Sequence, residues 1–227
     1  MQKKSSIYLY VGLGLCLVSV LYTVMVMSID RENIGPELSA IGFSTLNEAI
    51  FTAIGVHMSL YTLTEILGFI PLGVALAYLV FGIVEWVRKK SLKKVDFSLI
   101  LLGIFYVVLA FLYFALDKIR VNYRPVLING ALESSYPSTH TMLTTFIMIS
   151  SMMVLRRFTF NKAVIISTDI ISVLLTVVIV TCRFLSGVHW FTDILGGLLI
   201  ASSLLLTFKA FLLINNDLGS KAVVTVK

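Results

Sequence analysis

Charged residues are scarce in this 227-residue chain, at 13% of the sequence, whereas hydrophobic residues make up 58%. The mean hydropathy of +0.98 lies far above that of soluble domains and predicts an integral membrane protein. The only two cysteines, Cys16 and Cys182, lie in different apolar segments, which gives no support for a disulfide framework or a cysteine zinc site. The sequence also lacks internal repeats, low-complexity tracts and a glycine-rich phosphate loop.

Acidic residues are outnumbered by basic ones, and the formal net charge is +6. A basic chain can bind nucleic acid, but here the Lys and Arg residues stand in short clusters between apolar segments and form no continuous face. Five of the seven residues 88–94 are basic, and such a cluster marks a cytoplasmic loop under the positive-inside rule. The charge pattern therefore indicates membrane topology, and we expect no nucleic-acid partner.

Six apolar segments are long enough to cross a bilayer as helices of about 20 residues. They are residues 7–28, 63–87, 97–116, 138–155, 163–182 and 191–214. The first is too long for the apolar region of a signal peptide, so we interpret it as a retained helix. Apolar residues at helical spacing within 29–61 predict amphipathic surface helices between the first two spans. We therefore expect an all-α fold, a single polytopic domain over residues 1–227 with six transmembrane helices.

This layout predicts which parts of the chain lie on each side of the plasma membrane. With the 88–94 loop inside, both termini are cytoplasmic, and the loops 117–140 and 182–193 face out. Thirteen of the eighteen Lys and Arg residues then lie on the cytoplasmic side. Four of the other five fall in the two outer loops, namely Lys118, Arg120, Arg124 and Arg183. Because topology disfavours positive charge there, we expect these side chains to bind an anion.

The helix start at residues 138–140 is well suited to phosphate. Ser138, Thr139 and His140 open an apolar helix, whose unpaired N–H groups and dipole attract anions. Arg124 and Arg183 add planar forks that match pairs of phosphate oxygens. The outer loops therefore favour binding of a phosphoryl group.

His189 and Asp193 are four residues apart, so on a helix the carboxylate can hold the imidazole as an orienting partner holds a nucleophile or base. The alternative is an interfacial histidine followed by an aspartate that caps the next helix. No set of metal ligands accompanies the two histidines in these loops. We therefore expect phosphoryl transfer without a metal or other cofactor.

Three sequence elements, in order, resemble the signature of the type 2 phosphatidic acid phosphatase superfamily, which also includes vanadium haloperoxidases. They are Lys118 with Arg124-Pro125, then Pro137-Ser138-Thr139-His140, then Arg183, His189 and Asp193 with five and three residues between them. The six-span layout is similar to that of the integral bacterial lipid phosphatases of this family, and extends the resemblance over nearly the whole chain.

The resemblance implies a role for each motif residue. His189 attacks phosphorus and forms a phosphohistidine, Asp193 orients it, and His140 protonates the leaving oxygen and later activates water. The residues implied to hold the phosphoryl oxygens are Lys118, Arg124, Ser138, Thr139 and Arg183.

The chain departs from the family pattern at three positions. Thr139 replaces the usual Gly and Cys182 the usual Ser. The family pattern has six residues between its Lys and its Arg, but here only residues 119–123 separate Lys118 from Arg124. Asp117 stands where the pattern has its lysine. Arg120 is therefore an alternative to Lys118 for the lysine's role.

The expected activity is hydrolysis of a lipid phosphate or diphosphate at the outer face of the membrane. Candidate substrates are undecaprenyl diphosphate, which is our first choice, phosphatidylglycerophosphate and phosphatidic acid. A phosphotransferase with the same site is an alternative, and a non-catalytic lipid-binding or transport protein is another. We expect no obligate protein partner beyond the bilayer and the lipid.

Overall fold

The computed structural model describes the backbone of residues 2–225 and the side chains of residues 3–216. It contains seven α-helices and two short 3-10 helices, and the described residues form no β-strand. The α-helices are α1 (Gln2–Ser28), α2 (Ser44–Ile54), α3 (Met58–Lys89), α4 (Phe97–Ile119), α5 (Thr139–Leu155), α6 (Lys162–Leu185) and α7 (Phe191–Thr225); the 3-10 helices are η1 (Pro36–Leu38) and η2 (Leu92–Lys94). The all-α prediction is confirmed.

Within the described part of the chain, the five helices α1, α3, α4, α6 and α7 are long and apolar enough to cross a membrane. The predicted fourth span is present as the apolar helix α5, which has 17 residues and a length of roughly 26 Å at 1.5 Å per residue. Several of its Ser and Thr side chains are buried, which the helix tolerates because it lies among other helices and not against lipid. The chain is a multi-pass membrane protein.

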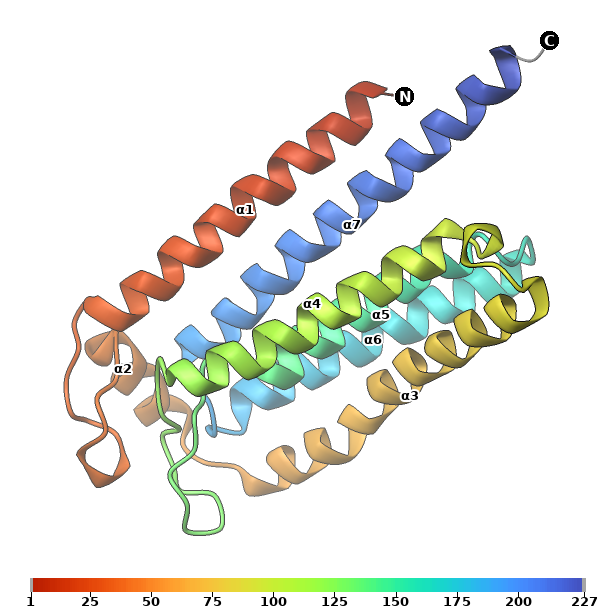
Figure 1. Ribbon diagram of the computed structural model, residues 1–227. Helices are drawn as coiled ribbons and strands as arrows, with labels where there is room; N and C mark the ends of the chain where they lie inside the picture. The colour runs from red at the N-terminus through yellow and green to blue at the C-terminus, as the bar shows by residue number, and fades with distance from the viewer. Residues whose placement is uncertain (1, 226–227) are drawn as a thin grey trace.

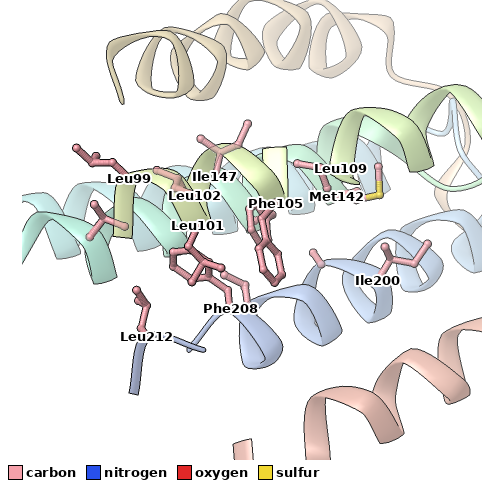
Figure 2. Close-up of a cluster of buried hydrophobic side chains, with 14 of the residues drawn as sticks. Leu99, Leu101, Leu102, Phe105, Leu109, Met142, Ile147, Ile200, Phe208 and Leu212 are labelled. Carbon is pink, nitrogen blue, oxygen red and sulfur yellow. The ribbon is translucent and has the colours of Figure 1, made fainter. Parts of the chain in front are cut away.

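The long helices form a bundle in which α1 and α7 run side by side and α3 lies on the far side, with α4, α5 and α6 between them (Figure 1). At the core of the bundle, side chains of α4, α5 and α7 pack together. Figure 2 shows Phe105 of α4 and Phe208 of α7 in this cluster, with ring centroids 5.4 Å apart in an edge-on arrangement. This packing fixes the starts of α5 and α7 relative to the end of α4.

Two helices extend past the spans predicted for them. α4 continues to Ile119 instead of 116, so Asp117 and Lys118 are helical and do not belong to a loop that starts at 117. α6 continues to Leu185 instead of 182, which places Arg183 in its last turn. The physical reason is that basic side chains are stabilised by the negative end of a helix dipole, so hydropathy falls before the helix ends.

The predicted surface helix between the first two spans is α2, preceded by η1. Ser44 and Asn47 are buried on its inner face, whereas Leu46 is exposed. α2 lies at the same end of the bundle as the loop before α5 and the joint between α6 and α7, and the opposite end holds η2 (Figure 1). The residues that the sequence marked as functional therefore gather at one end.

Candidate active site

A cavity of about 390 Å³ opens at this end of the bundle. Arg120, Arg124, Glu133, Thr139 and His189 are among its lining residues. The helix ends that hydropathy placed together do meet here, because this cavity takes residues from the end of α4, the start of α5 and the joint between α6 and α7.

The loop 186–190 places His189 in the wall of the cavity. Gly187 has a φ of 68°, and a Cβ there would lie 2.1 Å from the carbonyl oxygen of Gly55, so only glycine fits. The N–H of His57 donates to the Ser186 carbonyl at 2.9 Å. The start of α3 thus anchors this loop.

His189 is 5% exposed, and its Nδ1 lies 3.0 Å from the carbonyl oxygen of Ser135. A carbonyl can only accept, so the proton is on Nδ1 and Nε2 carries the lone pair. Nε2 is buried and has no hydrogen-bond partner among the described residues. Burial and the positive charges of Arg124 and Arg183 lower the pKa of His189 well below its ordinary value of 6.5. A neutral imidazole with a free Nε2 is suited to act as a nucleophile.

Asp193 makes several contacts besides the one expected with His189. Its Oδ2 lies 3.6 Å from Nδ1 of His189 and accepts the N–H of Trp190 at 2.9 Å. The second contact is that of a carboxylate at the third helical position, which reaches back to the residue before the helix. The side chain is completely buried. Asp193 therefore caps α7 as well as facing the imidazole, and the Ser135 carbonyl is the nearer partner of His189.

A buried amide network that the sequence did not reveal surrounds Asp193. The Asn122 side chain donates to Oδ1 of Asp193 at 3.4 Å and accepts the N–H of Gly42 at 3.0 Å. Asn47 of α2 donates to Oγ1 of Thr192 at 2.9 Å and accepts its N–H at 3.3 Å. The surface helix α2 thus clamps the start of α7. No local pattern marked either asparagine, because each partner lies far away in the sequence.

At the start of α5, Ser138 is buried between helices, whereas Thr139 faces the cavity. Ser138 is fully buried; its N–H donates to the Asp193 carbonyl at 3.0 Å, and its hydroxyl accepts from Thr141 at 3.0 Å. Thr139 lines the cavity. Ser138 thus ties α5 to α7, and the free first-turn N–H groups begin at Thr139.

Arg124 reaches the cavity from a folded loop. Asn129 and Gly130 both have positive φ, as required at the tip of a tight hairpin, and the returning chain brings Glu133 opposite Arg124. Nε of Arg124 lies 3.0 Å from Oε2 of Glu133. Its Nη1 is buried and has no hydrogen-bond partner within the described part of the chain. This donor is available to an anion in the cavity.

Arg183 and His140 interact with an acidic residue outside the motifs. Nη2 of Arg183 lies 2.5 Å from Oε1 of Glu65 in α3 and also contacts Nδ1 of His140. Nε2 of His140 lies 3.8 Å from the same Glu65 oxygen. His140 lines a second, smaller cavity of about 230 Å³ between α3, α4 and α5, and Tyr113 and Thr139 line both cavities. The two histidines therefore face adjoining spaces.

Lys118 does not line the cavity. Nor do the buried motif residues Ser138, Arg183 and Asp193, while His140 lines the second cavity. Tyr113, Asp117 and Arg120 line the cavity. Tyr113 and Asp117 are one turn apart on the same face of α4, and Arg120 is the left-handed residue that ends the helix. Lys118 is exposed, about 100° around the helix from Asp117 at 3.6 residues per turn. The shifted register thus gives the expected lysine position to an aspartate, and Arg120 supplies a cation to the cavity from the residue that ends α4. Among the described residues, no cluster of three His, Cys, Asp or Glu side chains could hold a metal ion.

The fold and the site define a multi-pass α-helical membrane protein with a histidine and arginine cavity at one end of its bundle. The model of the PAP2 superfamily matches residues 98–217, more than half of the chain and all three motif elements, so the protein belongs to that superfamily. The family resemblance noted from the motifs is confirmed.

A solved structure shares the fold. It is described as the first transmembrane PAP2 type phosphatidylglycerolphosphate phosphatase from Bacillus subtilis, and it aligns with a TM-score of 0.61 and 18% sequence identity over 88% of this chain and 94% of that one. No curated protein sequence matches this chain.

Proposed function

We propose that this protein is a metal-independent membrane lipid phosphatase that acts through a phosphohistidine. The observation that carries the proposal is the state of His189: Nδ1 is held by the Ser135 carbonyl, while Nε2 is buried without a partner among the described residues in the wall of a cavity that Arg124 also lines. An oriented lone pair next to anion-binding donors is the arrangement that attack on phosphorus requires.

In the first step, the Nε2 lone pair of His189 forms a bond to phosphorus as the bond from phosphorus to the lipid oxygen breaks. His140 gives a proton to that oxygen, and Arg124, Arg183 and the first-turn N–H groups of α5 hold the phosphoryl oxygens. In the second step, His140 takes a proton from water, the water oxygen attacks phosphorus, and the bond to Nε2 breaks. Inorganic phosphate leaves and His189 is again neutral.

The substrate we propose is a lipid phosphate or diphosphate of the cell envelope, presented at the extracytoplasmic face. The basic residues 88–94 and the pair Arg156 and Arg157 lie at the end of the bundle away from His189, which supports an outward-facing site under the positive-inside rule. Undecaprenyl diphosphate, phosphatidylglycerophosphate and phosphatidic acid are the candidates, and the second is also named for the Bacillus subtilis structure.

Phosphate release by the purified protein from short-chain forms of these three lipids, in detergent with EDTA, tests the proposal. We expect His189→Ala to abolish release. His57→Ala, which removes an exposed histidine at the start of α3, should retain it. Acid-labile, base-stable phosphate on His189 would establish the covalent step. Full activity of His189→Ala, or wild-type protein inactive on every lipid, would refute the assignment.

A further inference from the structure

Glu65 is a carboxylate within the membrane-spanning helix α3, a location where ionisable groups are costly and usually serve a function. It lies outside the three motif elements, and the mechanism proposed above does not use it. Its Oε1 is 2.5 Å from Nη2 of Arg183, a residue 118 positions away. The proposed mechanism therefore does not explain why Glu65 contacts Arg183.

The contact with Glu65 occupies Nη2 of Arg183, the nitrogen that two-point binding of a phosphoryl group would use. A guanidinium group grips two oxygens at once along either of two edges, and Nη2 belongs to both edges. In this structure Nη2 is shared between Glu65 and Nδ1 of His140. Nε and Nη1 are buried with no hydrogen-bond partner among the described residues. Two-point binding of phosphate by Arg183 therefore requires Nη2 to give up a present partner.

Burial shows which partner can move. The Arg183 side chain has no exposed surface, whereas the Glu65 side chain is 43% exposed and lies in the wall of the second cavity. The Tyr61 ring is 5.0 Å from the guanidinium carbon of Arg183 and helps to fix it. The carboxylate can therefore turn into the cavity while the guanidinium stays in place.

We propose that Glu65 competes with the phosphoryl group for Arg183, so that it weakens the binding of inorganic phosphate and speeds its release after hydrolysis. The reason is electrostatic: the carboxylate and phosphate are both anions, and only one can make the short contact with Nη2. The inference rests on the proposed function in requiring Arg183 to bind phosphoryl groups, and it adds a residue that sets the affinity of that site.

The test compares Glu65→Gln with Glu85→Gln in the full-length protein. Glu85 lies on the same helix and pairs with Lys89 at 2.7 Å, at the end of α3 away from the cavity, so this control removes an ion pair without touching the site. Inhibition of lipid hydrolysis by inorganic phosphate should tighten by about tenfold in Glu65→Gln, as expected for loss of a charged competitor, and stay unchanged in Glu85→Gln. KM and kcat should both fall, because phosphate leaves more slowly.

Unchanged or weaker inhibition by phosphate in Glu65→Gln would overturn the proposal and leave Glu65 a structural counter-ion. In an Arg183→Gln background, Glu65→Gln should have no further effect on phosphate inhibition; an undiminished effect would also overturn it. If Glu65→Gln does not fold, Glu65→Asp withdraws the carboxylate by one methylene and should tighten inhibition by a smaller factor. Weaker inhibition in that variant would count against the proposal.

Direct binding of inorganic phosphate, measured by calorimetry without any lipid, separates this proposal from the proposed function. Wild-type protein that hydrolyses none of the lipids would refute the phosphatase assignment. Tighter phosphate binding in Glu65→Gln would still support competition for Arg183, whereas equal binding in both proteins would overturn it.

Discussion

The shifted register of α4 allows a direct test of which cation at its end serves the site. Asp117 and Arg120 line the cavity, whereas Lys118 is exposed and rotated by about 100° from Asp117. Removing one preorganised charged donor from a phosphoryl-transfer site costs about 10²- to 10³-fold in rate. Arg120 is itself exposed, so solvent screening reduces its share. We therefore expect Arg120→Ala to lower kcat/KM by about 10- to 100-fold.

Lys118→Ala is the matched control, since it removes a neighbouring cation from the same turn. We expect it to change kcat/KM by less than about threefold, the small effect usual for an exposed charge. Asp117→Lys, added to Arg120→Ala, puts a cation on the cavity face of α4 and should recover part of the activity. Phosphate release from the best lipid substrate measures all three variants. A larger loss in Lys118→Ala than in Arg120→Ala would refute the reasoning from helix geometry.

Three further predictions follow from other parts of the site. Burial lowers the pKa of His189 well below 6.5, so as pH falls the imidazole is protonated in the unfolded chain before it is protonated in the folded protein. The wild-type Tm should therefore drop more between pH 7.5 and 5.5 than the Tm of His189→Gln. Equal drops in the two proteins would contradict this. Asn122→Ala removes the amide next to Asp193 and should lower kcat by about tenfold or more. Asn216→Ala, which removes an exposed asparagine at the other end of α7, should not lower it. Equal activities would exclude a positioning role for Asn122. The topology can be tested with single cysteines in a background without Cys16 and Cys182. Asn129→Cys should react with an impermeant thiol reagent in intact cells, and Lys93→Cys should react only after permeabilisation. The reverse result would place the site on the cytoplasmic side.

Hydropathy predicted most of the helices correctly before any contact between them was known. Apolar segments of about 20 residues predict spanning helices because backbone polar groups in lipid must be satisfied within the segment, and five of the six predicted spans are helices of spanning length. Hydropathy placed the ends of α4 and α6 too early, since both helices continue through Lys118 and Arg183 after hydropathy has fallen. Hydropathy and the positions of basic residues assigned four helix ends to one side, and the three motif elements were recognised by their resemblance to a known family.

Which side chains meet at the site depends on how the helices pack against one another. The rotation of α4 about its axis brings Asp117 to the cavity in place of Lys118, and that rotation depends on packing against α5 and α7. Arg120 reaches the cavity from the left-handed residue that ends α4. The partners Glu65 and Arg183 are 118 residues apart, and Asn47 and Thr192 are 145 residues apart. Such pairs carry no local periodicity, because a contact between distant segments depends on how whole helices pack. The sequence therefore located the candidate phosphate site, while packing selected the side chains that surround it.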